Sequence, residues 1–145
     1  GSPGHDEAEV SIYDTYTDIL FTGDIFYPGR LYINDWDAFS ASIKRLIHFT
    51  DTHPISYILG CHIEMSIYPR LDYLIRTTYR PYERPLQMTI AQLKSLGAAI
   101  QQVNGKPGVF PFDDFILYNG TPDRYFAYDT LHANVEPGTV CSVEP

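Results

Sequence analysis

The chain has 145 residues, the length of one domain, and its 44% hydrophobic and 19% charged content excludes an intrinsically disordered protein. Its formal net charge is −8, and its ten Lys and Arg are scattered, so the basic surface that binding to nucleic acid requires is missing. No apolar stretch approaches the roughly 18 residues that cross a bilayer, so we expect a soluble protein, cytoplasmic or exported through an upstream signal since removed.

Two adjacent antiparallel strands are predicted near the start of the chain. Residues 9–13 alternate polar and apolar side chains, which is typical of a half-buried strand. Residues 19–22 form a short apolar run that ends in Gly23 and Asp24, which favours a more buried strand opening into a loop.

A helix and a third strand are predicted next. From Asp35 onward, apolar residues recur at spacings of three and four, which predicts a helix over about 35–50 with Asn34 or Asp35 as its N-cap. Residues 55–60 have the composition of a strand, whose carboxyl end leads to His62.

The remaining chain predicts a loop, a helix and two strands. Residues 66–87 are rich in Tyr, Arg and Pro without a regular period, which indicates a long ordered loop. Thr89 caps a predicted helix over 90–103, and strands are expected at 115–118 and 125–128. Strands alternating with helices favour an α/β fold, with α+β as the alternative.

Three residues stand out as candidate metal ligands: His5, Asp24 and His62. Each lies in a predicted loop at a strand terminus, with a glycine one or two places before it that permits a sharp turn. Imidazole and carboxylate groups suit zinc, and a carboxylate can bridge two ions. Taken singly, each is more often an ordinary hydrogen-bonded surface residue.

Taken together, the segments around these residues resemble the second half of the metallo-β-lactamase superfamily. Members carry a Pro-Gly-His loop, a strand pair ending in Thr-Gly-Asp and a late strand ending in a Gly-x-His element. The matching segments here are Ser2-Pro3-Gly4-His5, Leu20-Phe21-Thr22-Gly23-Asp24 and Leu59-Gly60-Cys61-His62. Further segments are similar to a bacterial branch of general metallohydrolases: Tyr27-Pro28-Gly29, Leu31-Tyr32, Asp35-Trp36 and His62-Ile63-Glu64-Met65.

The resemblance implies a role for each candidate ligand. His5 matches the position that binds the first zinc, Asp24 the carboxylate that bridges both zincs and takes part in catalysis, and His62 the last ligand of the second zinc. The implied reaction is attack by a metal-bound hydroxide on an ester, thioester, lactam or phosphoester of a small-molecule substrate. The implied fold is half of a four-layer αββα sandwich, with one mixed sheet and two main helices.

One departure from the family pattern limits what the chain is expected to do. The family's His-x-His-x-Asp-His run is absent, and the other histidines are isolated: His48, His53 and His132. We therefore expect 1–145 to be a single partial domain, with 1–103 matching the family and 104–145 forming tail strands. Alone it should bind zinc weakly and turn over no substrate, because catalytic zinc ordinarily has three protein ligands.

The missing ligands leave three hypotheses open. The chain is an enzyme fragment whose partner is the missing amino-terminal half, or that half is a separate polypeptide, or the chain is a non-catalytic binding or structural module. A fragment should expose an apolar sheet face and an unpaired strand edge. A self-sufficient module should cover that face, either with the strands at 115–128 or by self-association.

Residues near the candidate ligands are weaker candidates for function. Neither of the two cysteines lies in a Cys-x-x-Cys pair, and Cys61 is interpreted as a small buried hydrophobe because residues adjacent on a strand point to opposite faces. Five others are possible pocket residues, although packing is the commoner role for exposed aromatics: Tyr27, Tyr32, Glu64, Tyr79 and Arg80.

Overall fold

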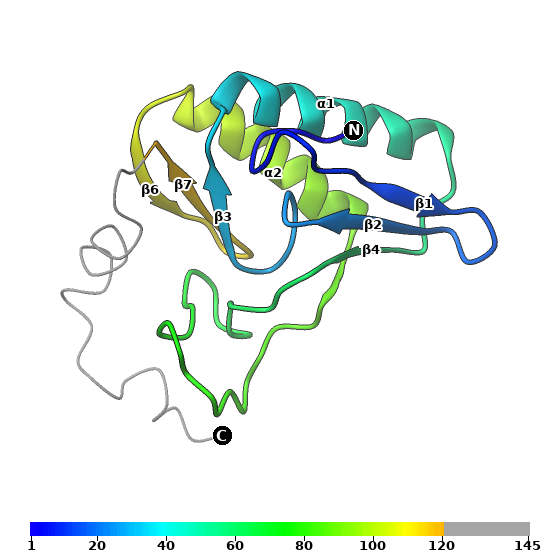
Figure 1. Ribbon diagram of the computed structural model, residues 1–145. Helices are drawn as coiled ribbons and strands as arrows, with labels where there is room; N and C mark the ends of the chain where they lie inside the picture. The colour runs from blue at the N-terminus through cyan, green and yellow to red at the C-terminus, as the bar shows by residue number, and fades with distance from the viewer. Residues whose placement is uncertain (121–145) are drawn as a thin grey trace.

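The computed structural model describes residues 1–120, which form two mixed sheets and two helices (Figure 1). In chain order the elements are β1 (Ile12–Asp14), β2 (Ile19–Gly23), β3 (Arg30–Ile33), α1 (Trp36–Thr52), β4 (Tyr57–Gly60), β5 (Gln87–Met88), α2 (Ile90–Val103), β6 (Gly108–Pro111) and β7 (Ile116–Asn119). The fold is therefore α/β, as the alternation of strand and helix patterns predicts. No helix within residues 1–120 has the length and apolar character to span a membrane.

The first sheet has the strand order β1-β2-β4-β5. The predicted antiparallel pairing of the first two strands is confirmed, and β4 lies parallel to β2 on its other side. Gly23 at the end of β2 is opposite Gly60 at the end of β4. The loops that follow these two strands therefore start from the same edge of the sheet.

The second sheet has the order β3-β7-β6, so the expectation of one mixed sheet is wrong. Strand β3 was not predicted, because three of its four residues are buried and no alternation of polar and apolar side chains marks it. The strand predicted at 115–118 is observed as β7, the central strand of this sheet. The strand predicted at 125–128 lies outside the described residues.

Both helices begin at the predicted caps. The Asp35 side chain accepts a hydrogen bond from the amide of Ala38 at 2.9 Å, and Thr89 forms a capping box with Gln92. Helix α1 extends two residues beyond its predicted end, and α2 ends where predicted. Figure 1 shows both helices on one side of β1, β2 and β4. The core between them includes Leu20, Phe39, Ile43, Ile58, Leu93 and Leu96.

The opposite face of the first sheet, which we call the outer face, carries exposed apolar side chains. Leu20 and Ile58 point to the helices, so their strand neighbours point away from them. Ile12, Phe21 and Tyr57 on this outer face are 61%, 42% and 51% exposed. Strand β7 does not cover them, because it pairs with β3 and β6 in the second sheet.

The long loop between β4 and β5 is held against the second sheet by a buried ion cluster. The Arg30 guanidinium at the start of β3 lies 2.7 Å from a carboxylate oxygen of Glu64 and 2.7 Å from one of Asp72. Burial lowers the pKa of Arg30, but the two carboxylates outweigh it and hold that pKa above its usual value, so the guanidinium stays charged. This cluster fixes the start of the loop, close to His62.

Candidate functional site

Asp24 lies in a tight turn directly after β2. Gly23 has a φ of 57°, in the left-handed region that favours glycine, and lets the chain turn away from the strand. The Asp24 amide donates a hydrogen bond of 2.7 Å to a carboxylate oxygen of Glu9. The turn is thus held through the backbone amide of Asp24. Within residues 1–120 no hydrogen bond of the Asp24 carboxylate helps to hold it.

His62 lies two residues beyond the end of β4. A Cβ at Gly60 would come within 2.4 Å of the Tyr27 Cβ and 2.5 Å of the Phe26 carbonyl oxygen, so this position requires glycine for close packing. The Cys61 amide donates to the carbonyl of Gly23 at 3.0 Å, which ties the end of β4 to that of β2. The parallel pairing of these strands therefore brings His62 beside Asp24.

His5 reaches the same region from the amino-terminal loop. The carbonyl of Gly4 accepts hydrogen bonds from the amides of Asn34 and Asp35 at 2.9 and 3.1 Å, which fixes this loop at the start of α1. The His5 Nδ1 atom is 2.9 Å from the carbonyl oxygen of Tyr32. The ring is thereby turned with its Nε2 atom toward Asp24.

The structure brings all three predicted residues together, with Asp24 in the middle. His62 Nε2 is 3.0 Å from Asp24 Oδ1, and His5 Nε2 is 3.9 Å from Asp24 Oδ2. Each imidazole thus faces a different oxygen of one carboxylate. Within residues 1–120, no group of three or more His, Cys, Asp or Glu side chains has the arrangement of a ready-made metal site.

The hydrogen bonds of these groups favour a bound cation. A backbone carbonyl only accepts, so His5 Nδ1 carries a proton, and Nε2 is the ring nitrogen that faces the carboxylate. A metal-binding histidine typically donates its other ring N–H to such an acceptor. Asp24 Oδ1 is buried and has no hydrogen-bond partner within residues 1–120, and His62 Nε2 lies 3.0 Å from it.

Glu9 is a part of this site that the sequence did not indicate. Burial raises the pKa of Glu9 above its usual value, while the hydrogen bond from the Asp24 amide and the nearby His5 ring oppose that rise. Its residue type and its place in the predicted first strand carry no signal of this role. Only the turn that brings Asp24 back toward residue 9 places the two side by side.

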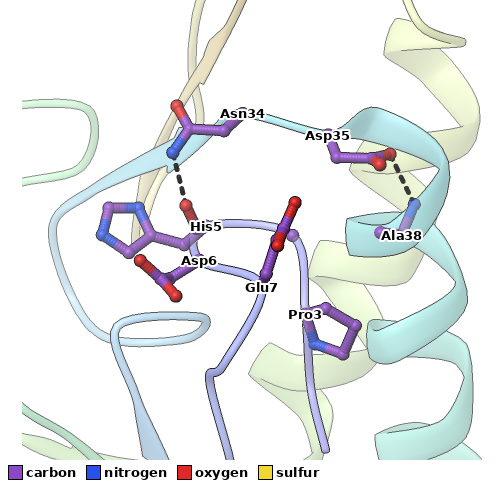
Figure 2. A pocket seen from close by; sticks show the side chains of 8 residues that line it. Pro3, His5, Asp6, Glu7, Asn34, Asp35 and Ala38 are labelled. Carbon is purple, nitrogen blue, oxygen red and sulfur yellow. Dashed lines mark hydrogen bonds between the residues drawn. The ribbon is translucent and has the colours of Figure 1, made fainter.

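An open pocket of about 580 Å³ adjoins His5 (Figure 2). It is lined by the amino-terminal loop and the start of α1: Pro3, Gly4, His5, Asp6, Glu7, Asn34, Asp35 and Ala38. The Asn34 amide donates to the His5 carbonyl, and the Asp35 carboxylate is engaged in capping α1. Asp6 and Glu7, which also line the pocket, are exposed.

The interpretation of Cys61 as a buried residue is wrong, because its side chain is exposed. Strand β4 ends at Gly60, so the alternation of faces along a strand does not extend to residue 61. Partial desolvation, followed by the charges of Asp24 and Glu9, raises the pKa of the Cys61 thiol. The thiol is therefore protonated at neutral pH, a poor form for a metal ligand.

Of the five weaker candidates, Tyr27 and Tyr32 contact a candidate ligand, Tyr32 through its carbonyl. The Tyr27 ring packs edge-on against that of His62, with centroids 5.2 Å apart. Burial and the nearby Glu64 charge raise the pKa of Tyr27 well above its usual range, so its phenol stays neutral. Glu64 and Arg80 form ion pairs of the long loop, and Tyr79 is exposed. His48 lies in the carboxyl-terminal part of α1, and His53 is the residue after this helix.

Comparison of the chain with models of protein families, with curated proteins and with solved structures finds no match in any of the three.

Proposed function

We propose that this chain is the carboxy-terminal part of a metallo-β-lactamase-fold hydrolase that acts on a small molecule through two zinc ions. His5 and His62 would each hold one ion, and the Asp24 carboxylate would be shared between them. The observation that carries this proposal is the placement of one imidazole on each oxygen of Asp24, at 3.9 and 3.0 Å. This arrangement is the one expected of a bridging carboxylate with two terminal ligands.

The spacing of these atoms fits zinc. Nitrogen and oxygen ligands lie about 2.0–2.2 Å from zinc, so two ligands of one tetrahedral ion are roughly 3.3 Å apart. The two separations in the structure, 3.9 and 3.0 Å, lie above and below this value. Binding of an ion would require the His5 and Asp24 atoms to move closer together and the His62 and Asp24 atoms to move apart.

The proposed reaction is hydrolysis of an ester, thioester, lactam or phosphoester. When bound, paired zinc ions activate water and polarise the oxygen of the bond to be cleaved. Two groups of this chain position the candidate ligands. The Tyr32 carbonyl orients the His5 ring, and the Glu9 carboxylate fixes the backbone of Asp24. The pocket lined in part by His5 could take a small substrate beside one of the three ligands, and neither Asp24 nor His62 lines it.

The outer face of the first sheet supports the view that the chain is one part of a larger fold. Its exposed apolar residues, Ile12, Phe21 and Tyr57, are not covered by any element within residues 1–120, as a fragment requires. Three ligands for two ions are also fewer than catalytic zinc needs. We therefore propose that the isolated chain binds zinc weakly and is inactive, and that the amino-terminal half completes the four-layer sandwich.

Equilibrium dialysis with metal analysis tests this proposal. The isolated chain should bind zinc with low affinity, and Asp24→Asn should abolish this binding, because the amide cannot bridge two cations. Asp51→Asn, on the exposed surface of α1, is the matched control and should bind as the wild type does. Two tightly held zinc ions per isolated chain would contradict the fragment proposal, and binding unaffected by Asp24→Asn would contradict the site.

A further inference from the structure

His62 is held differently from His5. The His5 ring is oriented by a hydrogen bond to a backbone carbonyl, whereas the His62 ring has no such hydrogen bond within residues 1–120. The His62 side chain is 54% exposed, so burial does little to restrict its rotamers. The ring lies beside the Asp24 carboxylate and packs edge-on against Tyr27, at an interplanar angle of 69°.

The Tyr27 ring is itself fixed at both ends. Its hydroxyl donates a hydrogen bond to the Arg30 carbonyl, and the residue is only 3% exposed. A Cβ at Gly29 would lie 2.4 Å from Tyr27 Cε2, and one at Gly60 would lie 2.4 Å from Tyr27 Cβ. Tyr27 therefore packs closely against both glycines, and this packing restricts its ring to one position.

We infer that Tyr27 is a positioning residue, whose ring fixes the orientation of His62 toward Asp24. A rigid ring packed against an exposed imidazole removes rotamers that turn the imidazole away from the carboxylate. Tyr27 would thus orient His62, as the Tyr32 carbonyl orients His5. The consequence of this orientation for metal binding rests on the proposed function. Groups that orient a metal-binding histidine through a hydrogen bond typically change metal affinity by about 10- to 100-fold, and we expect this packing contact to act at the lower end of that range.

The first test is nuclear magnetic resonance of the His62 ring in the metal-free protein. In the wild type we expect a nuclear Overhauser cross-peak between the Tyr27 and His62 rings, together with a single His62 χ1 rotamer. Tyr27→Phe keeps the ring and should preserve the His62 ring shifts, whereas Tyr27→Leu should move them toward those of a free histidine. Tyr79→Leu, at a largely exposed tyrosine, is the matched control and should change nothing.

The second test is calorimetric titration with zinc alone. Tyr27→Leu should weaken zinc binding about 10-fold, while Tyr27→Phe and Tyr79→Leu should bind like the wild type. Wild-type affinity in folded Tyr27→Leu would overturn the inference and leave the proposed function intact. A wild type that orders His62 but binds no zinc would overturn the proposed function and leave the positioning role standing.

The wild-type spectrum keeps the inference testable if Tyr27→Leu fails to fold. Absence of the Tyr27–His62 cross-peak, or averaging of His62 over several rotamers, would then overturn it without any variant. Circular dichroism of each variant shows whether it is folded before the titrations are compared.

Discussion

At the scale of single residues, Gly60 fixes how closely the two site-bearing strands approach. Its backbone is not in the left-handed region, so what it requires is space rather than an unusual conformation. An added methyl group would lie 2.5 Å from the Phe26 carbonyl oxygen and 2.4 Å from the Tyr27 Cβ, and both distances are too short for non-bonded atoms. Neither atom is the tip of a flexible side chain that can move aside.

Gly60→Ala should therefore lower the free energy of unfolding by about 1–3 kcal/mol, the usual cost of overpacking. Gly97→Ala is the control, because a Cβ there meets only the tip of the Ile47 side chain. It should stay within about 1 kcal/mol of the wild type, since alanine is favoured over glycine inside a helix. Urea denaturation followed by circular dichroism measures both, and equal effects would contradict the packing argument.

Asp14, the last residue of β1, gives a prediction that depends on pH. Its carboxylate accepts hydrogen bonds from the Thr17 hydroxyl and the Tyr16 amide, and these lower the pKa of Asp14 below its usual value of 3.8. A lowered pKa in the folded state stabilises the protein above the unfolded-state pKa, and the gain is lost as the pH falls through the folded value.

Asp14→Ala should thus destabilise the protein at pH 6, and the difference from the wild type should shrink as the pH is lowered below about 4. Thermal unfolding midpoints of both proteins across this range measure the effect. A difference in unfolding midpoint that stays constant down to pH 2 would show that the charge of the Asp14 carboxylate does not cause the destabilisation.

The candidate ligands were accessible from the sequence, whereas Tyr27 was indicated only as a possible pocket residue and Glu9 was not indicated at all. His5, Asp24 and His62 have chemically distinctive side chains next to glycines, so residue type and motif order indicate them. Glu9 and Tyr27 belong to common surface and packing types, and their roles come from contacts between segments distant in the chain. No local pattern encodes such contacts.

At the scale of elements, both helices and the strands of the first hairpin were predictable because each has an amphipathic period or a clear apolar run. Strand β5 has only two residues and β6 ends in Pro111, so neither offers a pattern long enough to recognise. The parallel pairing of β2 with β4 was also not predictable from periodicity. It depends on α1 crossing over between them and packing on the core side.

The loop of residues 61–86 depends on the Arg30 cluster, so Arg30→Met should be strongly destabilising. The substitution leaves the nearly inaccessible Asp72 carboxylate and that of Glu64 without their cation, which typically costs about 3–5 kcal/mol. Arg70→Met is the control: its ion pair with Asp113 is exposed and should contribute no more than about 1 kcal/mol. Comparable losses in urea denaturation for both variants would contradict this account of the loop.

At the scale of the whole molecule, two features support the proposal that the chain is one part of a larger fold. Helices cover one face of the first sheet, and its apolar outer face is exposed; the candidate site brings together His5, Asp24 and His62. Under the proposed function, two catalytic zinc ions would need more than three ligands. We propose that a further half would pack against the outer face and supply the remaining ligands.

Crystals of the chain grown with zinc, with anomalous diffraction recorded on both sides of the zinc absorption edge, test the shared site most directly. The account predicts anomalous density at the Asp24 carboxylate, within about 2.0–2.2 Å of His5 Nε2 or His62 Nε2. Density only at other positions, or ordered side chains at residues 5, 24 and 62 that hold no metal at saturating zinc, would contradict it.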